Sequence, residues 1–85
     1  MEQLYLTVIY KEGEIWEILR LHRNITVARM DIKDALLDEY LNAIELGELP
    51  DIGTPVLCED SYCIRVEGTA ISGCILPMET NDQVH

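Results

Sequence analysis

Basic residues are scarce in this 85-residue chain, and nearly all of them lie in its first part. Residues 1–33 hold five acids and five bases, whereas residues 34–85 hold eleven acids and one base, Arg65. The net charge of −10 therefore belongs to the second segment. Attraction to nucleic acid depends on Lys and Arg that neutralise phosphates, so this balance argues against direct binding of nucleic acid. A basic protein surface is the expected counterpart of such a negative field.

Other absences each remove a class of protein. No run of 18 apolar residues is present, and the acidic balance disfavours anionic membrane surfaces, so we expect no membrane association. Residues 1–5 lack a basic region ahead of the apolar stretch, so they do not resemble a secretory signal, and a cytoplasmic location is expected. Three cysteines are a poor disulfide framework, because the count is odd. No catalytic signature and no glycine-rich phosphate loop is present, so we expect neither an enzyme nor a cofactor.

The residues that are present predict a small α+β fold. The apolar fraction of 48% suffices for one domain, which we place at residues 1–76, with a flexible polar tail at 77–85. Composition predicts strands at 4–10, 15–23, 25–30, 56–58, 62–66 and 70–76. The first three would form a β-meander, and the later ones a C-terminal hairpin region. Residues 15–23 also fit a short helix, with acids at its start and bases at its end, but the hairpin-like turn at 11–14 favours a strand.

One amphipathic helix is predicted near 32–46. Asp31 is a suitable N-cap, Asp34 lies in the first turn, and Gly47 is a suitable stop. The expected apolar stripe is Ile32, Leu36, Leu37, Tyr40, Leu41 and Ile44.

The outer face of this helix and the loop after it are acidic. The carboxylates are Asp34, Asp38, Glu39, Glu45, Glu48 and Asp51. One interpretation is a solvated face that provides solubility. Another is a row that imitates the phosphate spacing of nucleic acid and occupies a basic groove. A third is a divalent-cation site, but no segment has the acid spacing and internal glycine of a calcium loop.

Trp16, the sole tryptophan, has two interpretations. It fits the hydrophobic core, where tryptophan is highly buried on average. In a strand it would share a face with Ile18, Arg20 and His22, and if the helix covers the other face it would be an exposed interface anchor.

Cys58, Cys63 and Cys74 also have two interpretations. As free cysteines in strands they fit small buried hydrophobes. With His22 or His85 as the fourth ligand they could instead form a metal site, although the Cys58-x4-Cys63 spacing with Cys74 suggests zinc only faintly. Cysteine catalysis is disfavoured, because the surrounding acids would raise a thiol pKa.

The predicted order of three strands followed by a helix, with Asp34-Ala35-Leu36 in its first turn and Ala43-Ile44-Glu45-Leu46 near its end, resembles the N-terminal domain of HicB-type antitoxins. The resemblance covers about half of the chain. Met30-Asp31 stands where that family has glycine before the cap, and no DNA-binding extension follows. The resemblance implies a similar topology and does not predict a function.

Three functions are compatible with these observations. The first is a small acidic, non-enzymatic protein that binds and masks a basic, nucleic-acid-binding protein surface, as inhibitors of the anti-CRISPR or antitoxin kind do; the six acids and Trp16 would bind the partner. The second is a structural or regulatory subunit, such as a homodimer, that assembles through sheet edges and Trp16. The third is a small metal protein that uses the cysteines and His22.

Overall fold

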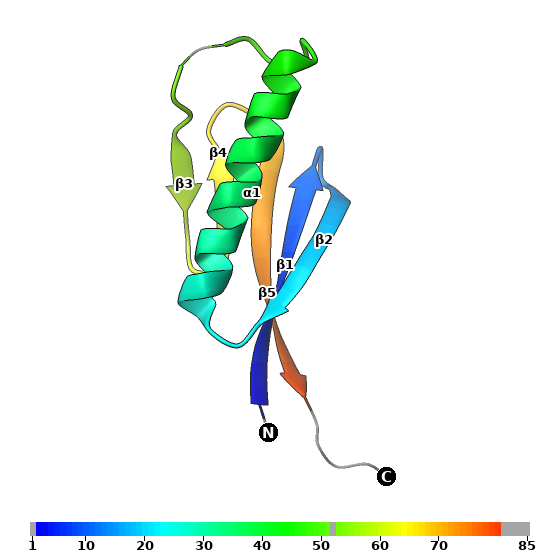
Figure 1. The fold of residues 1–85 in the computed structure, drawn as a ribbon, viewed down its shortest axis with the longest axis vertical. Coiled ribbons are helices and arrows are strands. Elements are labelled where there is room, and N and C mark those ends of the chain that lie inside the picture. The colour runs from blue at the N-terminus through cyan, green and yellow to red at the C-terminus, as the bar shows by residue number, and fades with distance from the viewer. Residues whose placement is uncertain (1, 52, 81–85) are drawn as a thin grey trace.

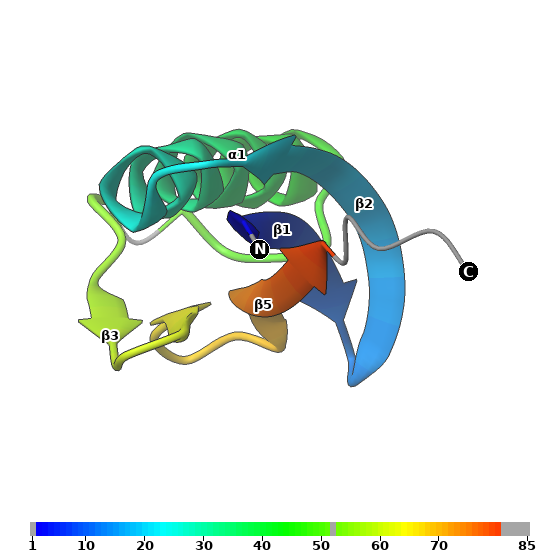
Figure 2. The ribbon, with the colours of Figure 1, turned by 90° about the horizontal axis from the view of Figure 1, so that it is seen from below.

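The computed structural model describes residues 2–51 and 53–80. Its elements are β1 (Glu2–Lys11), β2 (Glu14–His22), α1 (Ile25–Glu45), β3 (Leu57–Glu59), β4 (Cys63–Val66) and β5 (Ile71–Thr80). The five strands form one antiparallel sheet in the order β2-β1-β5-β4-β3. The helix lies across one face of this sheet, and β2 curves around its flank (Figure 1 and Figure 2). The predicted α+β class with a C-terminal hairpin is confirmed.

Side chains alternate between the two faces of the sheet. On β1 the odd-numbered residues face α1, since the Thr7 hydroxyl donates a hydrogen bond to Asp31 of the helix. The core between sheet and helix consists of Ile9, Ala28, Ile32, Leu36, Tyr40, Ala43, Ile64, Val66, Ile71 and Ile75. The opposite face, termed the outer sheet face, carries Leu4, Leu6, Val8, Tyr10, Ile15, Ile18, Leu21, Cys58, Cys63, Arg65, Ser72, Cys74, Leu76 and Met78. Within the described ranges, no second layer covers that face.

The helix begins at Ile25, so the strand predicted at 25–30 is wrong. Asn24 is the N-cap, and its Oδ1 accepts hydrogen bonds from the backbone N–H groups of Thr26 at 2.7 Å and Val27 at 3.3 Å. This cap and the burial of Ala28 override the strand preference of the β-branched residues around it. The HicB-like order of three strands before the helix is therefore absent, because α1 takes the place of the third.

The buried stripe of α1 also differs from the prediction. It consists of Ala28, Ile32, Leu36, Tyr40 and Ala43, whereas Leu37 and Leu41 are exposed. Ile32, Leu36, Tyr40 and the half-buried Ile44 still face the sheet, so the stripe is narrower than predicted, and the earlier start of the helix extends it to Ala28. Asp31 is therefore an interior helix residue and not the N-cap.

Strand β2 confirms the strand alternative for residues 15–23, and it contains two bulges. Its register against β1 shifts at Thr7/Val8 and again at Ile9/Tyr10, which leaves Leu19 and Trp16 as extra residues on β2. The outer-face residues of β2 are consequently three apart instead of two: Ile15, Ile18 and Leu21.

Gly73 lies directly opposite Ile32 of α1 on the helix side of the sheet. A Cβ atom built there would lie 2.5 Å from Cγ2 of Ile32, which is fully buried. The missing side chain therefore sets the distance between helix and sheet.

Strand β5 continues to Thr80 and pairs with β1 as far as Glu2. Residues 77–80 are thus strand, where the polar tail had been predicted to begin. The remainder of that predicted tail, 81–85, lies outside the described residues.

Candidate functional site

A groove of about 410 Å³ lies between β2 and α1, and carboxylates dominate its lining. The lining residues are Glu17, Leu19, Arg20, Asp31, Asp34, Ala35, Asp38 and Glu39. Five of them are acids and one is a base, so the concavity concentrates the negative charge of the chain. It is termed the acidic groove.

The two walls of the acidic groove come from different parts of the sequence. On the strand side, the bulge at Leu19 turns Glu17 and Arg20 to the face that carries the helix. On the helix side, Asp34 and Asp38 are four residues apart and therefore neighbours along α1.

Asp31 ties the two walls together. Its Oδ2 accepts hydrogen bonds from the Thr7 hydroxyl at 3.0 Å and from His22 Nε2 at 2.8 Å, and it lies 3.4 Å from Arg20 Nε. The side chains of Asp31 and His22 are largely buried. The network holds β2 against the helix and so fixes the width of the groove.

The other acids of the groove differ in how they are neutralised. Glu39 lies 3.7 Å from Lys11 Nζ, although its buried Oε2 has no hydrogen-bond partner. Glu17, Asp34 and Asp38 are exposed, and within the described ranges no cation pairs with them. Three free carboxylates are therefore available to an incoming basic group.

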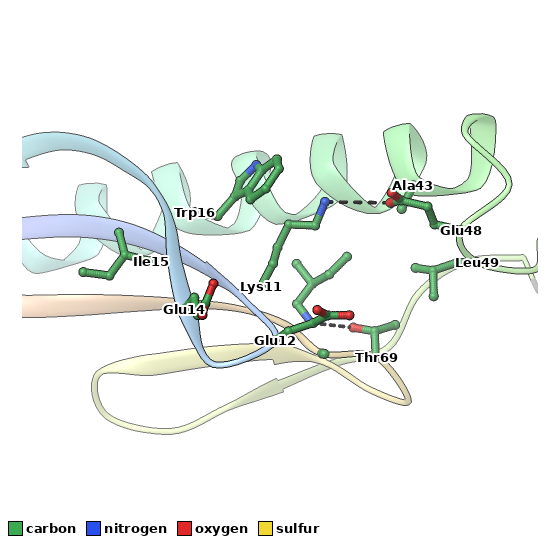
Figure 3. A pocket seen from close by; sticks show the side chains of 11 residues that line it. Lys11, Glu12, Glu14, Ile15, Trp16, Ala43, Glu48, Leu49 and Thr69 are labelled. Atoms are coloured by element: carbon green, nitrogen blue, oxygen red, sulfur yellow. Dashed lines mark hydrogen bonds and ion pairs between the residues drawn. The ribbon is translucent and has the colours of Figure 1, made fainter.

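A hollow of about 500 Å³ lies beside the groove at the β1–β2 turn (Figure 3). Lys11 lies at its centre, with Nζ 4.3 Å from the ring centroid of Trp16 and 3.9 Å from Glu48. Trp16 is 59% exposed, so the core interpretation is wrong. The prediction that Trp16 and Ile18 share a face is also wrong. The bulges place Trp16 on the helix side and Ile18 on the outer sheet face.

The structure brings only some of the predicted partner-binding residues together. Asp34, Asp38 and Glu39 line the acidic groove, whereas Trp16 and Glu48 line the hollow. Glu45 is exposed on the helix outside both concavities, and Asp51 lies in the loop after α1, where its Oδ1 accepts a hydrogen bond from the Gly53 N–H at 3.2 Å. Glu17 and Asp31 were not predicted as site residues. Their place in the site depends on the bulges, which no sequence signal marks, and on the true start of the helix, for which the Asn24 cap is the one signal in the sequence.

The cysteines and His22 do not converge. Cys63 and Cys74 are opposite each other on β4 and β5, with their sulfur atoms 2.7 Å apart, and burial together with the Cys63 thiol raises the pKa of Cys74 to about 12. His22 lies on the helix side of the edge strand β2, on the other face of the sheet. No group of three His, Cys, Asp or Glu side chains in residues 2–51 and 53–80 could hold a metal ion.

Comparisons with protein-family models, with curated proteins and with solved structures found no match to this chain. None of the helical structure in the described residues is long and apolar enough to cross a membrane. The groove and the hollow are therefore the features of the molecule that indicate a function.

Proposed function

We propose that this protein is a non-enzymatic binding protein whose acidic groove receives a basic segment of a partner protein and masks it. The observation that carries the proposal is the imbalance in the groove, where five carboxylates face one guanidinium. Glu17, Asp34 and Asp38 support it further, because they have no cation of their own within the described ranges.

Arginine is the side chain best suited to this arrangement. Asp34 and Asp38 are one helical turn apart, with a Cβ separation of about 5–6 Å. A planar guanidinium donates several hydrogen bonds in a fixed fork and binds carboxylates more specifically than an ammonium does. Surfaces that bind nucleic acid are rich in such residues, so an acidic groove would compete with phosphate for them. The proposed role is that of an inhibitor that acts as a nucleic-acid mimic.

Trp16 extends the proposed contact surface. Its ring is mostly exposed and already contacts one cation, Lys11. Aromatic rings beside charged grooves are common anchors of protein interfaces. We place the protein in the cytoplasm, where its three free thiols would remain reduced.

The experiment that tests this function uses a fluorescent arginine-rich peptide and the full chain. Fluorescence anisotropy measures the affinity for the peptide at low and high salt, with a neutral peptide of the same length as a second probe. We expect the double variant Asp34→Asn/Asp38→Asn to bind the arginine-rich peptide at least about tenfold more weakly, since charge-assisted hydrogen bonds contribute about 1.5–3 kcal/mol each.

The matched control removes the same charge elsewhere. Glu45→Gln/Glu67→Gln also lowers the negative charge by two, and both residues are exposed outside the groove. Its affinity should remain close to that of the wild type. If the two double variants lose affinity equally, binding follows net charge alone and the groove is not the site.

A further inference from the structure

The outer sheet face is apolar and is exposed mainly along β2 and the end of β5, whereas Val8 on β1 is buried. Ile15, Ile18 and Leu21 of β2 and Leu76 and Met78 of β5 are all exposed on it. Among its described side chains, Arg65 is the only one that carries a charge. A continuous apolar face of this kind usually marks an interaction surface.

We infer that a second copy of this chain covers the outer sheet face, so that two sheets pack face to face with their helices outermost. Such a dimer is a four-layer arrangement of helix, sheet, sheet and helix. It leaves the acidic groove of each copy open, because the groove lies on the helix side of the sheet.

The distribution of charge favours a second copy as the occupant. A partner that is chosen for its basic surface would find no carboxylate on this face among the described side chains. Another outer sheet face also carries Arg65 and no carboxylate among its described side chains, so no described acid is buried when the two meet. The acidic rows of the helices would then be separated by two helix diameters of about 10 Å and an intersheet gap of about 10 Å. That distance exceeds the Debye length of about 8 Å several times, so their repulsion is largely screened.

The size of the face fits a stable dimer. Strands β2, β1 and β5 contain nine, ten and ten residues. In projection they provide an area about 30 Å long and about 14 Å wide, which β4 and β3 widen further. With the relief of its side chains, the accessible area is on the order of the 800 Å² per partner that a standard interface buries.

The sheet edges are less suitable for assembly than the face. The two bulges interrupt the hydrogen-bonding edge of β2, and the other edge strand, β3, is only three residues long. Bulges and short edge strands are devices that prevent edge-to-edge pairing. We therefore expect the two copies to associate through the outer sheet face and not through the sheet edges.

Sedimentation velocity of the full chain from low to high micromolar concentration tests the inference. We expect the wild type to change from monomer to dimer over this range and the dimer to persist in high salt. Ile18→Asp, which places a charge on the exposed β2 part of the face, should remain monomeric with an unchanged circular dichroism spectrum, because Ile18 is 59% exposed in the single chain.

The control places the same charge on a residue of similar exposure elsewhere. Leu41 is 56% exposed on α1, and Leu41→Asp should dimerise like the wild type. A wild type that stays monomeric throughout overturns the inference. So does a dimer that survives Ile18→Asp or is lost in Leu41→Asp. Peptide binding to the acidic groove is measured separately, so the failure of one proposal leaves the other standing.

Discussion

The two faces of the sheet have similar apolar composition and opposite environments. Ile75 and Leu76 are adjacent in β5, yet Ile75 is fully buried under α1 and Leu76 is exposed on the outer sheet face. Strand β1 shows a weaker contrast, because Ile9 is buried in the core and Leu6 on the outer sheet face is half-buried. Strands that are apolar on both faces are typical of sheets that are covered on both sides. The single helix covers one of them, and the other is the face that a second copy would cover.

The largest expected difference between the faces comes from truncating Ile75 and Leu76. Ile75→Ala should lower the free energy of unfolding by about 3–4 kcal/mol, because it leaves a cavity in the core. Leu76→Ala should cost less than about 1 kcal/mol in dilute solution, since Leu76 is already partly solvated. Urea denaturation at several protein concentrations measures both.

Concentration separates the two variants further. The cost of Leu76→Ala should grow as the protein becomes more concentrated and the dimer forms, whereas that of Ile75→Ala should not. Equal costs at every concentration would mean that the two faces of the sheet do not differ energetically.

A substitution at Gly73 adds atoms between the sheet and α1 and removes no existing contact. Gly73→Ala should cost about 2–3 kcal/mol, because the new methyl group meets the buried Ile32 side chain. Ser72→Ala, one residue away on the outer sheet face, is the control and should change stability by less than about 0.5 kcal/mol. Thermal unfolding of the two variants gives the comparison, and a Gly73→Ala protein as stable as the wild type would show that helix and sheet are not in close contact there.

Asp31 and Asp34 allow a buried and an exposed carboxylate on the helix side to be compared. Asp31→Ala should cost about 2 kcal/mol, because the Thr7 hydroxyl and His22 Nε2 lose their acceptor. Asp34→Ala should be close to neutral, because Asp34 is exposed and has no partner in the described ranges. Chemical denaturation at neutral pH measures both, and similar losses would contradict the role of Asp31 as the tie between β2 and α1.

The last comparison concerns the outer sheet face and is made at alkaline pH. Burial and the neighbouring Cys63 thiol raise the pKa of Cys74 from 9.0 to about 12. The folded state therefore holds this proton more tightly than the unfolded state does, so the stabilisation is complete below pH 9.0 and is lost as pH rises towards about 12. The stability difference between the wild type and Cys74→Ser, measured from neutral pH upwards, should decline within that window. A difference that is independent of pH would contradict the raised pKa.

The fold class could be predicted because its strands have clear composition. The start of α1 could not, because Ile25 and Val27 favour strands, and only the Asn24 cap and the burial of Ala28 show the helix. Residues 15–23 were ambiguous for a physical reason. Two bulges space the outer-face residues of β2 three apart, which is close to helical periodicity.

The candidate site was predictable only where it lies within one element. Asp34 and Asp38 share a helix face at a spacing that can be read from the sequence. Glu17 and Asp31 join them through contacts between β2 and α1, which depend on the bulge at Leu19 and on the Thr7 hydroxyl. His22 and the cysteines were grouped in the sequence as possible metal ligands. The structure separates them, because they lie on different faces of the sheet.

The pairing of β1 with β5 has a practical consequence for engineering the molecule. Glu2 and Thr80 are directly opposite each other in the ladder, which places their Cα atoms about 5 Å apart. A short linker could therefore join these two positions, and new ends could be opened in the connection between α1 and β3. Such a circular permutant would retain every strand pair of the sheet, and a fluorescent label at its new ends would lie at the opposite end of the molecule from Glu2 and Thr80 (Figure 1).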